Sequence, residues 1–299
     1  MHPDPGGPRV GGSHTRAKRA TRGRVFSTQL THVRPVNKAA FFVNSALTFA
    51  FAELSTAALH ETGHGLMAQS LGFSPKIYAF YEDNPTGTIH QSLAILAAGP
   101  VASLILGLLF RAWYRSGEPR YSLGRLLLFW MSWLGIMQFV NYLIVTPWLT
   151  AGDTAQIADL LHVPVWGRYL VAAFGMVALF ILTRPAAHDM LALAPQSEAL
   201  DTPRDRRRFI VRSFYLPLFA GTLLTAPGGI GGLPTIVFYG MLGTIGNIDV
   251  IAFSLYRTGD EFVRKNAPGE AVRIEPITVV LYLIMVALYI FVLARGLPV

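Results

Sequence analysis

The chain has 299 residues, of which 52% are hydrophobic and only 14% are charged, and its formal net charge is +8. This composition excludes an ordinary soluble domain and is typical of a protein built from membrane-spanning segments. There is no cysteine, so disulfides and thiolate metal ligands are excluded, and a bound metal would need imidazole, carboxylate or water as ligands.

The first 38 residues form a basic segment that we expect to be disordered. They contain eight Lys or Arg residues and a single acidic residue, Asp4. Such a cluster before the first apolar run is an orientation signal that places the N-terminus in the cytoplasm. Binding to anionic lipid head groups is a compatible role, and an organelle transit peptide is an alternative. No nucleic-acid partner is expected, since Phe26 is the only Phe, Tyr or Trp in this segment.

Seven apolar runs follow, each about long enough to cross a hydrocarbon core of roughly 30 Å as a helix. They cover about 39–59, 91–111, 124–148, 167–184, 209–226, 234–255 and 276–295. The sixth run is the least regular, because glycines interrupt it and Asn247 and Asp249 lie within it. The runs are continuous instead of alternating, which argues against a β-barrel. We therefore expect an all-α, polytopic membrane protein with six to seven transmembrane helices.

The stretch "ALHETGHGLM", at residues 58–67, places three chemically active side chains at the end of the first run. His60 and His64 are four residues apart, so on a helix they share a face and can bind one metal ion. Glu61 can hold a water molecule without binding the metal itself. Zinc hydrolases use this spacing: zinc acidifies the water, and the glutamate takes its proton during attack on a carbonyl. Accidental packing is the alternative, but polar groups at membrane depth are costly without a purpose.

The residues around this motif resemble the site-2 protease family of intramembrane zinc metalloproteases. The resemblance is carried by "HETGHGLMAQSLGFSPKIYAF", which includes Gly72, and by "AILAAGPVASLILGLL", which includes Gly99 and Pro100. It is good over residues 50–110, weaker over 135–160, and covers about a third of the chain. It implies one Zn²⁺ per chain, cleavage of a transmembrane segment of another protein, and a zinc position nearer the cytoplasmic face.

The same family takes its third zinc ligand from an aspartate in a later span. Here the matching stretch is "NYLIVTPWLTAGDTAQI", at residues 141–157, and Asp153 is the corresponding aspartate. The match diverges, because Pro147 lies six residues after Asn141 instead of three, and Thr154 follows Asp153 where the family has glycine. By the same resemblance, Asn141 helps to hold the oxyanion or the substrate backbone.

Other assignments remain open for these residues. His162 and Glu53 are alternative third ligands, and Asp153 could instead be the N-cap of a helix that starts near Thr154. Glu53 lies seven residues before His60 on the same helix face. It could support a ligand or relay protons, or it could stay neutral and bonded to a neighbouring helix.

Basic residues alternate between the links that join the runs. The tail and the links 111–125, 184–208 and 257–273 are rich in Arg or Lys, whereas 71–89, 149–166 and 227–233 contain only Lys76. The positive-inside rule then puts the N-terminus in the cytoplasm and the expected metal ligands nearer the outer face. This conflicts with the cytoplasmic-side zinc that the resemblance implies, and the sequence leaves the side open.

Three segments are therefore expected: the tail at 1–38, a metalloprotease-like core at 39–165, and C-terminal helices at 166–299 with a cytoplasmic loop at about 185–208. The expected function is a zinc-dependent endopeptidase that hydrolyses peptide bonds in or near transmembrane segments. A non-proteolytic metal-binding scaffold or chaperone is the alternative, and a transporter is less favoured because no internal repeat is visible. The expected partners are a membrane-protein substrate and the lipid bilayer, and the oligomeric state is left open.

Overall fold

The computed structural model describes residues 37–78, 87–118, 120–150, 152–195, 198, 200–225 and 272–298. By their contacts, residues 34–299 form one compact unit, which includes both the expected core and the expected C-terminal helices. Nearly all of the predicted tail at 1–38 lies outside the described residues. The same holds for the sixth predicted run at 234–255, with Asn247 and Asp249, and for most of the link at 257–273.

The described part of the chain is mainly helical. Its helices are α1 (Lys38–Ser70), α2 (Ile89–Ser116), α3 (Leu123–Val145), α4 (Asp153–Leu160), α5 (Val165–Leu191), α6 (Pro203–Ile210), α7 (Leu216–Thr225) and α9 (Pro276–Phe291). A π-helical turn (Val211–Tyr215) joins α6 to α7, and a 3-10 turn (Leu293–Arg295) follows α9. Two short strands, β1 (Lys76–Ile77) and β2 (Leu297–Pro298), pair antiparallel. The prediction of an all-α fold did not include this pair.

Among the described residues, five helices are long and apolar enough to cross a membrane: α1, α2, α3, α5 and the segment Pro276–Arg295 that contains α9. This confirms a helical fold with several apolar spans, but it does not confirm six to seven of them. The predicted run at 209–226 lies, up to Thr225, in an unbroken helical stretch from Pro203 that consists of α6, the π-helical turn and α7, and this stretch is not among the five.

α1 is longer than the first apolar run, so its two histidines lie within the helix and not at its end. The helix continues past His60 to Ser70 because it stays packed against α2. Gly72 then stops it with a φ of +87°, a left-handed conformation that glycine adopts readily. The N–H of Phe73 bonds back to the Ala68 carbonyl at 3.1 Å, which satisfies one of the last carbonyls of the helix.

The predicted cytoplasmic loop at 185–208 begins later than expected. α5 continues through Pro185 to Leu191, because proline inside a helix removes one N–H donor without ending the helix when neighbouring elements support it. α6 then begins at Pro203, and Thr202 caps it by accepting the N–H of Asp205 at 3.2 Å.

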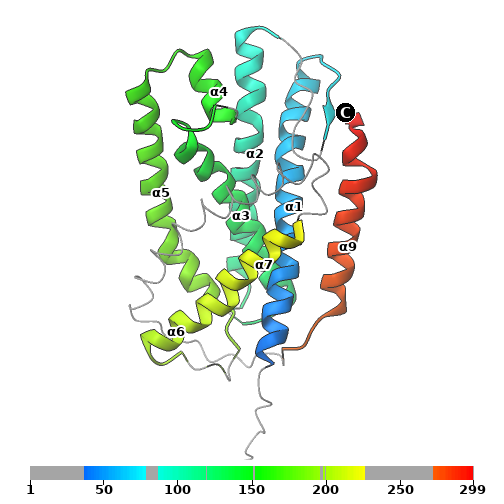
Figure 1. Cartoon of the computed structure of the whole chain (residues 1–299), viewed down its shortest axis with the longest axis vertical. Coiled ribbons are helices and arrows are strands. Elements are labelled where there is room, and N and C mark those ends of the chain that lie inside the picture. Colours follow the sequence, from blue (N-terminus) through cyan, green and yellow to red (C-terminus); the bar gives the residue numbers. More distant parts are fainter. Residues whose placement is uncertain are drawn as a thin grey trace, which may run out of the picture. The chain divides into compact units, whose positions relative to one another are not determined.

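α1 packs against α2, α3, α7 and α9, and it is therefore the central helix of the described unit (Figure 1). α2 and α3 approach each other through two glycines. A Cβ at Gly135 would lie 2.9 Å from the Ser103 carbonyl oxygen and 3.0 Å from Cα of Gly107. Such contact between backbones is typical of small residues in membrane helices.

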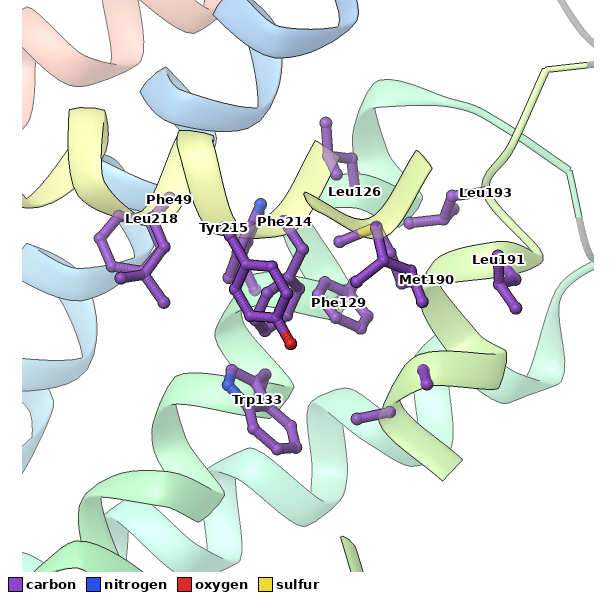
Figure 2. Packing of buried hydrophobic residues seen from close by; sticks show 14 of the residues in the cluster. Phe49, Leu126, Phe129, Trp133, Met190, Leu191, Leu193, Phe214, Tyr215 and Leu218 are labelled. Atoms are coloured by element: carbon purple, nitrogen blue, oxygen red, sulfur yellow. The ribbon is translucent and has the colours of Figure 1, made fainter. Parts of the chain in front are cut away.

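Aromatic side chains join the N-terminal halves of α1 and α3 to the π-helical turn (Figure 2). The Trp130 ring packs edge-on against Phe49 at 4.9 Å and stacks on Phe214 at 4.8 Å. The indole N–H of Trp130 donates to Ser45 Oγ at 3.2 Å, and Ser45 in turn donates to the Ser213 carbonyl at 2.9 Å. Each polar group in this chain of contacts is thus satisfied within an apolar layer.

Replacing Gly135 with alanine is expected to destabilise the protein by about 1–3 kcal/mol, because the added methyl group pushes α3 away from α2. Thermal unfolding in detergent measures the effect. Gly124→Ala, in the same helix, is the matched control, because a Cβ at Gly124 would meet nothing within 4 Å. An equal loss in both variants would contradict the close approach of α2 and α3.

Candidate metal centre

Three side chains from α1 and α4 converge on one point. Nε2 of His60 lies 3.1 Å from Nε2 of His64, and Oδ2 of Asp153 lies 3.0 Å and 3.3 Å from these two nitrogens. Both histidines are buried, and the Asp153 side chain is 13% exposed. The structure thus brings the three predicted ligands together in a group that could hold a metal ion.

The spacing of these three atoms fits one face of a tetrahedron around a metal ion. Tetrahedral ligands at about 2.0–2.1 Å from zinc are about 3.3 Å from each other. The observed separations of 3.0, 3.1 and 3.3 Å are close to this value. Small side-chain movements would therefore suffice to bind an ion at this point.

Hydrogen bonds on the far side of each imidazole orient its Nε2 toward this point. Nδ1 of His64 lies 2.7 Å from the Ile95 carbonyl oxygen, which can only accept, so Nδ1 carries the hydrogen. Nδ1 of His60 lies 3.1 Å from Ser103 Oγ. Ser103 donates its own hydrogen to Gln138 Oε1 at 3.1 Å and can therefore accept from His60. With Nδ1 as the donor, a neutral ring at either position leaves its Nε2 lone pair for a ligand, as in many metal sites.

This arrangement places three electron-rich atoms close together. Burial opposes ionisation of the Asp153 carboxyl, but hydrogen bonds from Nε2 of His60 and His64, which need a proton on the imidazoles, favour its charged form and lower the pKa of Asp153 to about 2. The carboxylate is therefore ionised at neutral pH. Its charge and the two Nε2 lone pairs call for a cation at their centre, either a metal ion or a shared proton.

Asp153 reaches the histidines because of the turn between α3 and α4. Thr154 donates to the Tyr142 carbonyl at 2.7 Å, and Thr146 donates to Thr154 Oγ1 at 2.8 Å, so the start of α4 is tied to the end of α3. The Tyr142 ring also stacks on His60, with centroids 5.2 Å apart and planes 5° apart. Tyr142 thus contacts His60 through its ring, and its carbonyl holds the segment that carries Asp153.

Gly99 makes room for the second histidine. A Cβ at Gly99 would lie 2.2 Å from Nε2 of His64 and 2.6 Å from two of its ring carbons. Pro100 follows inside α2, so the Gly-Pro pair belongs to the wall of the site. Gly63 on α1 faces the backbone of α2, since a Cβ there would lie 2.9 Å from the Ala98 carbonyl oxygen. Only glycine allows α1 and α2 to approach this closely at the level of His64.

Glu61 directly follows His60 in α1 and is half-buried. Its carboxylate acts electrostatically on His64 and on the hydroxyl of Tyr289 in α9. Tyr289 is fully buried against α1, where its hydroxyl donates to the Leu54 carbonyl. The predicted general base therefore lies near the metal ligands, on a side of α1 to which α9 also contributes.

The alternative third ligands lie outside this group. His162 is exposed in the turn after α4, with a φ of +51°, and Glu53 is half-buried on α1 before His60. The N-cap of α4 is Gly152, which makes no side-chain cap, so the N-cap alternative for Asp153 is wrong. No other set of three His, Asp or Glu side chains within the described ranges is positioned to share an ion.

Asn141, the second predicted catalytic residue, has a buried Oδ1 that lacks a hydrogen-bond partner in the described structure. It lies three residues after Gln138 on α3, so the two side chains share a face of that helix. Gln138 bonds to Ser103, which in turn contacts His60. Asn141 lies about one turn nearer the end of α3, from which the chain continues to Asp153. Its catalytic role stays a prediction.

Sequence reasoning missed the supporting residues, although two of them carried a signal. Ser103 lies four residues after Gly99 and therefore on the same face of α2. Gln138 is a polar residue within an apolar run, where such a residue usually has a partner. No comparable signal marked the Ile95 carbonyl or the Tyr142 ring, because their roles depend on how the helices pack.

Comparison of the chain with protein-family models, with curated proteins and with solved structures finds no match.

Asp153→Asn is expected to remove the metal, because it takes away the one charged ligand. Mass spectrometry of the detergent-purified protein should find about one zinc ion per wild-type chain and little in the variant. Asp159→Asn is the matched control, since this half-exposed carboxylate lies in the same helix and pairs with Arg168. Zinc retained in Asp153→Asn but lost in His64→Ala would show that another group is the third ligand.

Gly99→Ala is expected to weaken zinc binding by roughly 10–100-fold, the range seen when residues that orient metal ligands are changed. The added methyl group would occupy the place of the His64 ring. Competition with a chelator measures the affinity, and Gly124→Ala controls for a general effect of alanine in these helices. Unchanged affinity in Gly99→Ala would mean that His64 lies elsewhere when the ion is bound.

Proposed function

We propose that this protein is a zinc-dependent intramembrane endopeptidase that hydrolyses peptide bonds in or near transmembrane segments of other proteins. The observation that carries the proposal is the convergence of His60, His64 and Asp153 beside Glu61, within a unit of apolar helices. The proposal is also supported by the motif resemblance to site-2 proteases over residues 50–110.

The donor set fits zinc. Two imidazole nitrogens and one carboxylate oxygen are ligands that zinc accepts in hydrolases, and a chain without cysteine offers no thiolate alternative. Three protein ligands leave a fourth position for water or substrate, whereas structural zinc sites have four protein ligands. A zinc ion held there would supply Lewis-acid polarisation of a water molecule and of the scissile carbonyl.

The protein's own residues would carry the remaining steps. Glu61 takes a proton from the attacking water and passes it to the leaving amine. The Ser103–Gln138 pair and the Ile95 carbonyl hold the two imidazoles in the orientation that binds metal. The free Oδ1 of Asn141 can accept a backbone N–H of the substrate.

The membrane setting follows from the surface of the spans. α5 exposes many large apolar side chains, including Trp166, Phe174 and Ile181, and α9 exposes Leu283 and Phe291. These residues suit contact with lipid chains or with a substrate helix. A helical substrate must unwind locally, because an intact helix keeps its carbonyls bonded. Water must reach Glu61 for hydrolysis, so the site needs access to the aqueous phase.

A second candidate is a metal-binding scaffold that holds membrane proteins without cleaving them. Glu61 separates the two functions, since a scaffold needs the three ligands but no general base.

Glu61→Gln is expected to keep the metal and to lower cleavage by about 10²–10⁴-fold, because the amide cannot accept the proton. Cleavage is measured as the loss of intact membrane proteins in cells that express the wild type, by mass spectrometry of the membrane fraction. Glu118→Gln, at an exposed side chain, is the control. Equal membrane proteomes for wild type and Glu61→Gln, with zinc bound in both, would contradict the protease and favour the scaffold.

A further inference from the structure

The two ends of the spanning helices differ in charge. We define the basic end as the end where α1, α3 and α9 begin and α2 and α5 finish, and the metal end as the opposite one (Figure 1). Contacts at the basic end show that these termini lie together. Arg111 and Arg115 of α2 pair with Asp189 of α5, while Asn44 of α1 bonds to the Tyr121 hydroxyl and the Arg273 carbonyl.

Most of the described Lys and Arg residues lie at the basic end. They are Lys38, Arg111, Arg115, Arg120, Arg125, Arg184, Arg204, Arg206, Arg207, Arg208, Arg212 and Arg273. At the metal end the described cations are Lys76, Arg168 and Arg295, and Arg168 is paired with Asp159. This difference in charge is found among the described residues alone, so it does not depend on the predicted run at 234–255.

The contact between α1 and the start of α9 shows on which side the last span begins relative to the first. From the sequence alone, the side reached by the last span depends on how many spans precede it. In the structure, Asn44 Oδ1 accepts the N–H of Glu275, and Asn44 donates to the Arg273 carbonyl at 2.7 Å. α1 and α9 therefore begin on the same side, whatever the path between α7 and α9.

The metal ligands lie toward the less basic end. At a rise of 1.5 Å per residue, His60 is about 33 Å along α1 from Lys38 and only about 15 Å from Ser70. Asp153 follows the end of α3. Exposed Trp148 and Trp166 lie on either side of α4 in the sequence, and such residues are typical of the membrane–water interface.

We propose that the basic end faces the cytoplasm, and that the metal centre opens toward the extracytoplasmic face. Lys and Arg are retained on the cytoplasmic side of membrane proteins, and no comparable cluster among the described residues opposes this orientation. If the proposed protease function holds, its substrates are apolar membrane segments cut where they approach the extracytoplasmic boundary. This is opposite to the cytoplasmic-side zinc that the family resemblance implies.

The absence of cysteine allows a direct test by single-cysteine labelling. Ser70 and Ser116 are a matched pair: each is exposed in the last turn of its helix, and each donates to the carbonyl three residues earlier. Ser70 ends α1 at the metal end, and Ser116 ends α2 at the basic end. Intact cells that express Ser70→Cys or Ser116→Cys are treated with a membrane-impermeant maleimide, before and after permeabilisation.

We expect Ser70→Cys to be labelled in intact cells and Ser116→Cys only after permeabilisation. The reverse pattern, or equal labelling of both in intact cells, would overturn the orientation. Zinc content equal to that of the wild type confirms that each variant is folded. Labelling does not require cleavage, so the two proposals are tested separately. A labelling pattern that contradicts the orientation would not contradict the protease function, and a lack of cleavage would not contradict the orientation.

Discussion

The close approach of α1, α2 and α3 through glycines is the constraint on which the metal centre depends. Gly63 and Gly99 bring α1 against α2 at the level of His64, and Gly107 and Gly135 bring α2 against α3. Only at this separation can the Ile95 carbonyl reach one imidazole, while Ser103 spans from His60 to Gln138. A larger side chain at these glycines would separate the helices and leave buried polar groups without partners, which is costly in an apolar environment.

Several buried polar side chains elsewhere in the unit have hydrogen-bond partners within the protein. Asn44 is fully buried, and its amide is bonded to the segment just before α9 and to the segment before α3. Thr154 and Thr146 tie α4 to α3. The candidate site differs, because three electron-rich atoms meet there without donors of their own. His60, His64 and Asp153 are therefore arranged to bind a cation, whereas Asn44, Thr146 and Thr154 hold helices together.

The sequence predicted the parts of this site that depend on local spacing. His60 and His64 share a helix face because they are four residues apart, and the apolar runs gave the main helices because length and hydropathy determine them. Asp153 came from a resemblance, and the structure places it beside both histidines. Helix ends were less predictable: α1 passes two glycines within its motif because α2 packs against it, and α5 continues through Pro185. The short β1–β2 pair and the stacking of Tyr142 on His60 join distant residues, which a single sequence does not reveal.

The most direct test of the metal centre is a crystal structure with anomalous diffraction recorded on both sides of the zinc absorption edge. One zinc peak per chain is expected, about 2 Å from Nε2 of His60, Nε2 of His64 and Oδ2 of Asp153. A peak bound by other residues would show that this group is not the metal site. The absence of any peak after zinc has been supplied would show that the three side chains share a proton instead of a metal ion.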